Sequence, residues 1–296
     1  MLINWKRYLK KALYFHRISW HWLLGHRVRA HEYAVDYDTV SATYNRTWEA
    51  RMGKHTQSML DRVIAQPGSR ILDLACGTGF VLECQAKKLS PAEMIGIDCS
   101  KGMLELARER LSEKCREWSG RFILSHGDML EEIRKLPDAH FDVVTCCWAM
   151  SYSRPDALMR EISRVLKSGG MAGIVDNTRQ TLPGVEQAVI ELMQEAPLDF
   201  RTVNDIRFRL PAGSTSLKRL FGKNGLVCCE HWDGEETFEF RNGTEAVVWL
   251  FECGALAGNF RLFGRTDMSN RLAQVFDRKG LRSTVHRFCA VVGKKC

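Results

Sequence analysis

The chain has 296 residues, of which 45% are hydrophobic and 26% are charged, the composition of a globular protein with a substantial core. No apolar run approaches the roughly 20 residues that a membrane-spanning helix needs, so none is expected. The formal net charge is +8, and residues 1–31 hold seven lysines and arginines without an acidic residue. The rest of the chain is therefore nearly neutral, and the basic character belongs to its N-terminal segment.

The first predicted element is an amphipathic helix within residues 1–24. Lysines and arginines take much of one face, and aromatic residues widen the apolar face. This pattern is typical of a helix that lies in the plane of an anionic membrane surface, and a lid or an oligomer contact is an equal alternative. The apolar stripe consists of Leu2, Trp5, Leu9, Leu13, Trp20 and Leu24.

Four histidines of this segment recur every five residues, a spacing that turns the side chain by about 140° on a helix. They should therefore share no face, and no metal site is expected there or elsewhere. They are His16, His21, His26 and His31. We define residues 1–34 as a basic N-terminal arm and 35–296 as one domain.

A glycine turn follows the first predicted strand, Ile71–Ala75, after an expected helix over 46–66. Cys76-Gly77-Thr78-Gly79 lets the backbone take positive φ and lets a ligand approach closely. The next strand, Met94–Asp98, ends in a carboxylate 19 residues after Gly79. That spacing is close to the one at which an acidic residue meets ribose hydroxyls. A dinucleotide site would need a third glycine, and Glu83 stands there instead.

Short strands and helices continue to alternate after Asp98. This alternation predicts a Rossmann-like, doubly wound α/β fold with a mostly parallel seven-stranded sheet and an antiparallel last strand. We expect the core over 35–177, and helical substrate-side insertions over 178–224 and 233–283. The further predicted helices are 101–115, capped by Ser100, 154–167, 244–257 and 266–279. The further predicted strands are 121–125, 141–147, 171–175, 225–232 and 284–293, with a Gly234-Glu235-Glu236 turn after the sixth strand.

Several ordered motifs together resemble the class I S-adenosylmethionine-dependent methyltransferases. They are Asp73-Leu-Ala-Cys-Gly-Thr-Gly79 with Asp98, Gly127-Asp128-Met129, Phe141–Trp148, and Arg160–Gly170 with its Gly-Gly turn. Within that family the chain looks most like the small-molecule branch that includes the ubiquinone and menaquinone C-methyltransferases. The resemblance covers roughly residues 35–180, and it implies S-adenosylmethionine as the cofactor.

The resemblance also implies roles for individual residues. Asp73 would hold the amino end of the cofactor, Asp98 its ribose, and Asp128 the exocyclic amine of its adenine. Asp98 and Asp128 have an alternative role as helix caps, and Met103 and Trp148 are as consistent with core packing. The full expected cofactor-binding set is Tyr37, Tyr44, Asp73, Ala75, Cys76, Gly77, Gly79, Asp98, Cys99, Met103, Asp128, Met129 and Trp148.

Methyl transfer from a sulfonium is an in-line displacement with an excellent leaving group, so it needs approach geometry and exclusion of water more than catalytic groups. An oxygen or carbon acceptor would still need a base. His231 and His126 are candidates for that role, and the alternative for each is a structural histidine. Tyr152 is a third catalytic candidate, and Tyr152 and Asn177 follow predicted strands where they could orient an acceptor.

The sequence thus predicts a methyltransferase for a small, apolar or membrane-associated acceptor, such as a lipid, a quinone or a secondary metabolite. One alternative is an RNA or protein methyltransferase that binds through the basic arm. A second alternative is a non-catalytic, cofactor-binding partner subunit. Eleven cysteines without a Cys-x-x-Cys pair predict reduced thiols and hence a cytoplasmic protein. If the amphipathic arm binds a membrane, the protein would be peripheral at its inner face. The sequence does not indicate an oligomeric state.

Overall fold

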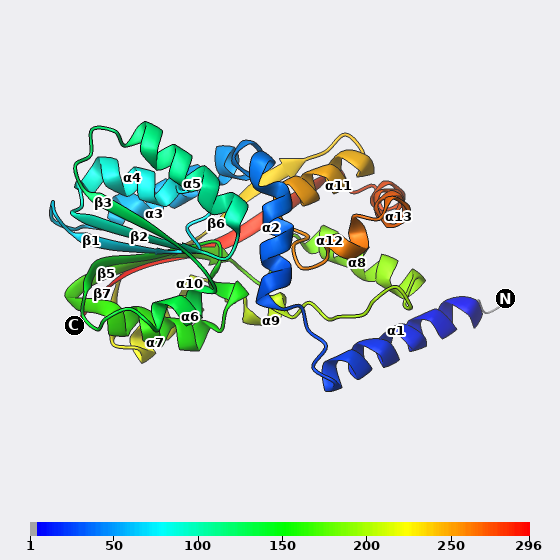
Figure 1. The fold of residues 1–296 in the computed structure, drawn as a ribbon. Coiled ribbons are helices and arrows are strands. Elements are labelled where there is room, and N and C mark those ends of the chain that lie inside the picture. The colour runs from blue at the N-terminus through cyan, green and yellow to red at the C-terminus, as the bar shows by residue number, and fades with distance from the viewer. Residues whose placement is uncertain (1–4) are drawn as a thin grey trace.

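A seven-stranded sheet forms the centre of the computed structural model, which describes residues 5–296 (Figure 1). The strand order is β3-β2-β1-β4-β5-β7-β6, and β7 runs antiparallel to both of its neighbours. The expected doubly wound sheet with an antiparallel last strand is confirmed. The strands are β1 Arg70–Leu74, β2 Glu93–Asp98, β3 Arg121–His126, β4 Phe141–Cys147, β5 Leu166–Asn177, β6 Leu226–Glu239 and β7 Ser283–Lys295.

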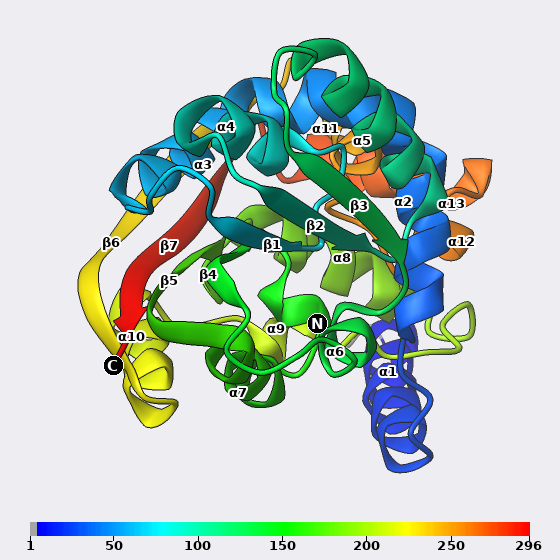
Figure 2. The ribbon, with the colours of Figure 1, turned by 60° about the vertical axis from the view of Figure 1, so that its left-hand side comes forward.

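Helices cover both faces of this sheet, and Figure 2 shows the two layers on opposite sides of the strands. One layer is α3 (Ala50–Arg62), α4 (Phe80–Leu89) and α5 (Lys101–Lys114), and the other is α6 (Met129–Ile133), α7 (Pro155–Val165) and α10 (Ser214–Lys223). Neighbouring strand residues alternate between the layers: Ile71 belongs to the core cluster under α3 and α4, and Leu72 to the cluster on the opposite face. This alternation is why the central strands are apolar on both sides.

A second group of helices lies beyond the carboxyl ends of the parallel strands (Figure 1). It comprises α8 (Pro183–Glu195), α11 (Gly243–Glu252), α12 (Phe260–Phe263) and α13 (Thr266–Arg278), and it shares an apolar core with the end of β5 and with β7. The short α9 (Ile206–Arg209) lies in the connection between α8 and α10. These helices form a wall above the edge of the sheet where ligands bind in such folds.

Helix α2 (Ala30–Tyr44) crosses this edge between the sheet and the second helical group (Figure 1). The buried Asp36 carboxylate accepts hydrogen bonds from the backbone N–H groups of Gly258 (2.7 Å) and Phe260 (3.2 Å). On the other side, Asp38 accepts from Ser100 Oγ (2.6 Å) and from the Gly102 N–H (2.9 Å). Helix α2 is thereby tied both to the loop before α12 and to the start of α5.

The predicted turn at Gly234-Glu235-Glu236 is wrong, because β6 continues through these residues to Glu239 and stays paired with β7. The Glu236 side chain is held by Arg51, Lys54 and His55, and these partners lower its pKa to about 2. Ion pairing thus stabilises an acidic side chain in a strand, which sequence patterns assign to a turn. The expected insertion boundary at residue 233 accordingly falls inside β6.

Two further boundaries differ from the predictions. Strand β5 begins at Leu166, five residues before the predicted start, because Leu166 already pairs with Phe141 of β4. The helix expected over 46–66 begins with one π-helical turn, Asn45–Glu49, and α3 ends at Arg62. Such single π turns occur often at functional sites.

Helix α1 (Trp5–Leu23) extends away from the body of the molecule (Figure 1). Its stripe residues from Trp5 onward are exposed, with Trp5 at 70% and Leu9 at 64%. Leu2 lies outside the described residues. The helix contacts the body through another face, where Arg17 donates to the Phe200 carbonyl at 2.6 Å.

Two of the four N-terminal histidines meet despite their spacing. The helix ends at Leu23 and Gly25 turns the chain (φ +67°), which brings His26 Nδ1 within 3.1 Å of His21 Nδ1. The expectation that the four histidines share no helix face assumed a continuous helix, and the chain turns before His26. Within residues 5–296, no group of three potential metal ligands occurs, and no helix is both long and apolar enough to cross a bilayer.

Replacing the carboxylate that anchors α2 should destabilise the fold. Asp36→Ala would leave two backbone N–H groups without partners, which costs about 1–3 kcal/mol of unfolding free energy. Thermal unfolding should show a clear decrease in Tm. The matched control is Asp61→Ala, which removes an exposed carboxylate whose contact is to Gln57. An equal Tm for both variants would contradict this role of Asp36.

Candidate active site

A cavity of about 700 Å³, including its open side, lies at the carboxyl edge of the sheet. It lies beside the ends of β1 and β4, the switch point at which the strand order reverses and where open α/β sheets bind ligands. Its walls are Ala30, Tyr33, Tyr37, Tyr44, Ala75, Gly77, Asp98, Cys99, Met103, Asp128, Met129, Cys147, Trp148, Ala149 and Tyr152.

A second hollow continues from the cavity under the glycine turn, and it shares Tyr44, Ala75, Gly77 and other wall residues with it. It adds Asp73, Cys76 and Thr78 to the lining. Every predicted cofactor-binding residue except Gly79 lines one or both of these hollows. Gly79 precedes α4 as its N-cap at φ +81°, and an added Cβ would lie 3.1 Å from the Ala107 Cβ, so this glycine allows close helix packing, and its contact with the cofactor stays a prediction.

Two of the five non-glycine residues that have positive φ within residues 5–296 lie at this site. Ala75, which follows β1, has φ +53°, and Trp148, which follows β4, has φ +62°. Such residues cost of order 1–3 kcal/mol each, and they cluster at functional sites. Gly77 has φ +51°, and a Cβ added there would meet nothing within 4 Å, so its backbone is open to a ligand.

Asp98 joins the loops that follow β1 and β2. Its buried carboxylate accepts hydrogen bonds from the N–H groups of Gly77 and Ser100, both at 2.8 Å. The cap of α5 is Ser100, as predicted, because its Oγ accepts from the Met103 N–H at 3.1 Å. Asp98 is therefore not the cap of that helix, and its contact with a ribose stays a prediction.

Asp128 does cap a helix, as the alternative interpretation proposed. Its Oδ1 accepts from the N–H groups of Leu130 (2.9 Å) and Glu131 (3.1 Å) at the start of α6. Asp128 also lines the cavity beside Met129. Because both capping bonds use Oδ1, the cap and a contact with a ligand are compatible.

Asp73 has a buried carboxylate that is only partly hydrogen-bonded within residues 5–296. Its side chain is buried at the end of β1, and Oδ1 accepts from Thr145 Oγ1 at 2.7 Å. The other oxygen, Oδ2, is buried without a hydrogen-bond partner in residues 5–296. Burial raises the pKa of this carboxyl to about 7. A cationic donor in the adjoining hollow would satisfy Oδ2, and the amino group of S-adenosylmethionine is such a donor.

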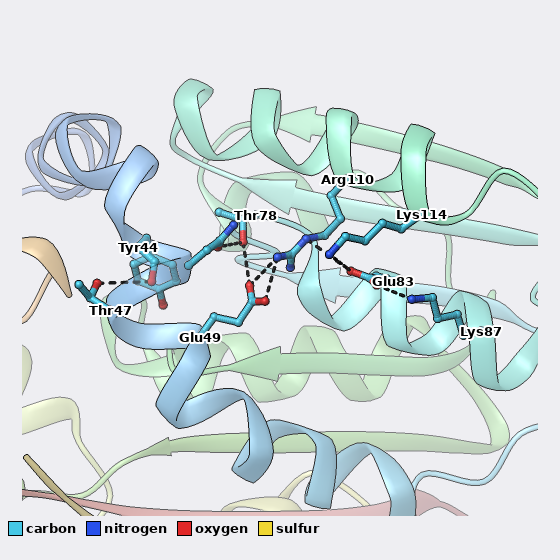
Figure 3. Close-up of polar contacts among 9 residues, drawn as sticks. Tyr44, Thr47, Glu49, Thr78, Glu83, Lys87, Arg110 and Lys114 are labelled. Carbon is cyan, nitrogen blue, oxygen red and sulfur yellow. Dashed lines mark hydrogen bonds and ion pairs between the residues drawn. The ribbon is translucent and has the colours of Figure 1, made fainter.

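An ion-pair network supports the glycine turn from behind (Figure 3). The largely buried Arg110 of α5 lies 2.8 Å from Glu49, and its Nε lies 3.5 Å from Glu83 of α4. Thr78 Oγ1 donates to Asn45 Oδ1 at 2.6 Å. The π-helical turn, the glycine turn and helices α4 and α5 are thereby fixed relative to one another.

The two histidines predicted as bases do not reach the cavity. His231 lies on β6, three strands from β4, and its Nδ1 is 3.1 Å from Ser214 Oγ. His126 is exposed at the end of β3, with Nε2 3.0 Å from the Cys99 carbonyl. Tyr152 does line the cavity, and its hydroxyl lies 2.7 Å from that of Tyr37.

Asn177 also lies away from the cavity lining. Its Oδ1 is 3.2 Å from Nδ1 of His286, a buried histidine of β7 that the sequence analysis did not single out. Burial lowers the pKa of His286 to about 3. Asn177 therefore orients a neutral imidazole within the aromatic core.

Several residues of the lining were not predicted from the sequence, above all Tyr33. On α2 Tyr33 lies one turn before Tyr37, and its ring packs on Tyr152 at 4.9 Å between centroids. The i, i+4 spacing of the two tyrosines was the available signal. The other missed lining residues of the main cavity are Ala30, Cys147 and Ala149.

Comparisons with known proteins agree with this geometry. Residues 71–170 match the model of a family described as a methyltransferase domain. A demethylmenaquinone methyltransferase of Staphylococcus aureus is 28% identical over 204 residues, covering 64% of this chain and 77% of that protein. An uncharacterized protein of Haemophilus influenzae is 41% identical over 95 residues, which are 32% of this chain and only 36% of that protein.

Solved structures show the same fold at low identity. The YcgJ protein of Bacillus subtilis superposes with a TM-score of 0.56 at 19% identity, over 82% of this chain and 98% of that one. The [4+2]-cyclase SpnF superposes with a TM-score of 0.58 at 18% identity, over 91% and 97% of the two chains. Since one fold hosts several chemistries, these likenesses support the architecture, and the site carries the chemistry.

The affinity for S-adenosylmethionine should depend on pH through Asp73. Its carboxyl has a pKa near 7, so below that pH a proton must leave before the carboxylate can pair with an ammonium group. The Kd should therefore rise by up to about tenfold for each pH unit below 7 and level off above it. Calorimetry between about pH 5.5 and about pH 8.5 measures this profile.

The control is Asp73→Asn, which should bind the cofactor more weakly and with a nearly flat pH profile. Calorimetry of the unmodified protein in buffers of different ionisation enthalpy should also detect release of a proton on binding below pH 7. A Kd that does not change with pH in the unmodified protein would show that Asp73 does not pair with the cofactor.

Proposed function

Since the chain is a class I S-adenosylmethionine-dependent methyltransferase, we propose that it methylates a small, apolar or membrane-resident acceptor, and that α1 binds an anionic membrane surface. The exposed apolar stripe of α1 is the single observation on which the proposed membrane binding rests. The largely apolar cavity supports an apolar acceptor. The comparisons support methyl transfer from S-adenosylmethionine, and we propose in addition the acceptor class and the membrane surface.

The lining of the two hollows suggests how this chain holds its cofactor. Asp73 and the open backbone of Gly77 would bind the amino-acid end, and Asp98 would accept from the ribose hydroxyls with charge-assisted hydrogen bonds. Asp128 and Met129 would contact the adenine. The bound cofactor supplies an electrophilic methyl group, and the protein contributes orientation and exclusion of water.

The walls of the main cavity favour an apolar acceptor. Four tyrosine rings, Trp148 and two methionine side chains line it, and its charged lining residues within 5–296 are Asp98 and Asp128. The matching demethylmenaquinone methyltransferases act, by their name, on a quinone, and the apolar character of that acceptor is what we carry to this chain as part of the proposal.

The arrangement of α1 favours a membrane surface over a lid. A lid or packing helix would bury its apolar stripe, whereas Trp5, Leu9 and Trp20 are all more than half exposed. Lysines outside the apolar stripe would reach the anionic headgroups along the edges of the buried helix, as in an in-plane amphipathic helix. Nucleic-acid binding would instead favour aromatic residues interleaved with the charges.

Transfer of label identifies the acceptor class. The protein is incubated with S-adenosylmethionine labelled at its methyl carbon and with a cell extract, which is then separated into lipid, water-soluble, RNA and protein fractions. We expect label in the lipid fraction or in apolar metabolites, and less label with Asp73→Asn. Label that enters RNA or protein would contradict the proposed acceptor and support the alternative binding role of the arm.

Membrane binding should depend on the exposed stripe of α1. The double substitution Trp5→Ser with Leu9→Ser should lower binding to vesicles containing phosphatidylglycerol by about tenfold or more, since each buried side chain of this size contributes about 1.5–3 kcal/mol. Co-sedimentation measures this loss. Cofactor affinity should be unchanged.

The matched control removes apolar exposure elsewhere, with Ile64→Ser and Val227→Ser, whose side chains are 73% and 58% exposed on the body. That variant should sediment with vesicles like the unmodified protein. Equal binding by both double variants would rule out α1 as the membrane contact. Equal binding to vesicles of pure phosphatidylcholine would rule out the role of anionic lipid.

A further inference from the structure

Four tyrosines meet in the cavity with their rings nearly perpendicular to one another. Tyr152 contacts Tyr33 at 4.9 Å and 72° and Tyr37 at 5.8 Å and 84°, and Tyr37 contacts Tyr44 at 6.1 Å and 74°. All four line the cavity beside Trp148. Perpendicular rings around one space form the kind of aromatic cage that binds substituted ammonium groups.

The backbone keeps these rings in place. Gly254 and Gly258 lie in the loop before α12 with φ of +74° and +86°, and a Cβ on either would come within 2.7 Å of the Tyr37 or Tyr33 ring. Tyr33 also donates to Asn204 Oδ1 at 2.9 Å. The rings are therefore fixed before a ligand arrives, which limits the entropy lost on binding.

The charged groups around this space all have one sign. Within residues 5–296, the lining of the two hollows contains no lysine, arginine or histidine. Its carboxylates are those of Asp73, Asp98, Asp128 and Glu49. A phenolate, enolate or thiolate acceptor would thus be buried near carboxylates without a cationic side chain to stabilise it, and the sulfonium of the cofactor would be the one positive charge beside it.

Once the cofactor is bound, the same lining keeps no free carboxylate to act as a base. Asp73 would pair with the amino group of the cofactor, and Asp98 and Asp128, which already accept backbone hydrogen bonds, would hold its ribose and adenine. Glu49 is paired with Arg110. Burial raises the pKa values of Tyr37 and Tyr44 well above 10, so their phenols stay protonated. An acceptor that must lose a proton during the transfer would find no group to take it.

We propose that the acceptor atom is an amine nitrogen, held by the cage of Tyr33, Tyr37, Tyr44 and Tyr152. This inference rests on the proposed function and narrows its acceptor to an apolar molecule that carries an amine. The nitrogen enters as the neutral base, the form that burial favours.

The transfer then balances without a catalytic base. The nitrogen lone pair forms the new C–N bond as the C–S bond breaks, and sulfur keeps the electron pair of that bond. The positive charge passes from sulfur to nitrogen, so the cage faces a cation before and after the step. A primary or secondary amine releases its proton to water after the product leaves, and a tertiary amine has none to release.

A pair of isosteric probes tests the cage. The protein is first saturated with S-adenosylhomocysteine and then titrated, by calorimetry, with choline and with 3,3-dimethylbutan-1-ol, in which carbon replaces the quaternary nitrogen. We expect choline to bind about tenfold more tightly, as a desolvated cation–π site predicts. Tyr37→Leu and Tyr152→Leu should abolish this preference, whereas Tyr37→Phe, which keeps the ring, should retain most of it.

The outcomes separate this inference from the function that it rests on. If S-adenosylhomocysteine itself does not bind, the proposed function fails. If it binds and the neutral isostere binds as tightly as choline, only the amine acceptor is refuted. Tighter binding of an ionised nitrophenol would likewise refute it and indicate an oxyanion acceptor. Leucine variants that still bind S-adenosylhomocysteine but keep the preference would show that the cage is not the site.

Discussion

A carboxylate buried with one unpartnered oxygen is the constraint on which the rest of this structure depends. Asp73 lies near the end of β1, and within residues 5–296 Thr145 is the one hydrogen-bond partner of its carboxylate. Folding alone gains nothing from such a group, because an unsatisfied buried acceptor costs about 1–3 kcal/mol. It becomes favourable when a cation enters the hollow beside it. The positive-φ residues at the ends of β1 and β4, the Asp98 hydrogen bonds and the Arg110 ion pairs all hold the surrounding loops at that position.

The sequence was sufficient for the sheet and for the glycine turn, because both depend on local patterns. Apolar runs that end in Asp73 or Asp98 predict strands and their carboxyl ends, and parallel strands bring these ends to one edge. The limits of β6 were not predictable, because Glu236 is stabilised by Arg51, Lys54 and His55 from a distant helix. Nor was the placement of His231, which depends on strand order and not on the local pattern.

Charge is divided between two parts of the molecule in a way that fits their proposed partners. Within residues 5–296, the charged side chains that line the hollows are all carboxylates, consistent with a sulfonium cofactor and a nitrogen acceptor. The arm contains the excess of basic residues and an exposed apolar stripe, consistent with an anionic lipid surface. An amine-bearing lipid would satisfy both at once, because its headgroup would reach the cavity while its chains stay in the membrane. Neither the acidic hollows nor the amphipathic arm would by itself point to an amine-bearing lipid.

The two anchors of α2 have a mechanical consequence. Asp38 binds Ser100 and Gly102, and Ser100 in turn donates its N–H to Asp98, so a continuous chain of hydrogen bonds links the tyrosine helix to the cofactor side of the cavity. Asp36 fixes the same helix to the opposite wall. The two ligands therefore share one rigid frame, and occupancy of either half should be sensed by the other. Whatever change one ligand makes in the affinity for the other, the second ligand must make equally in the affinity for the first.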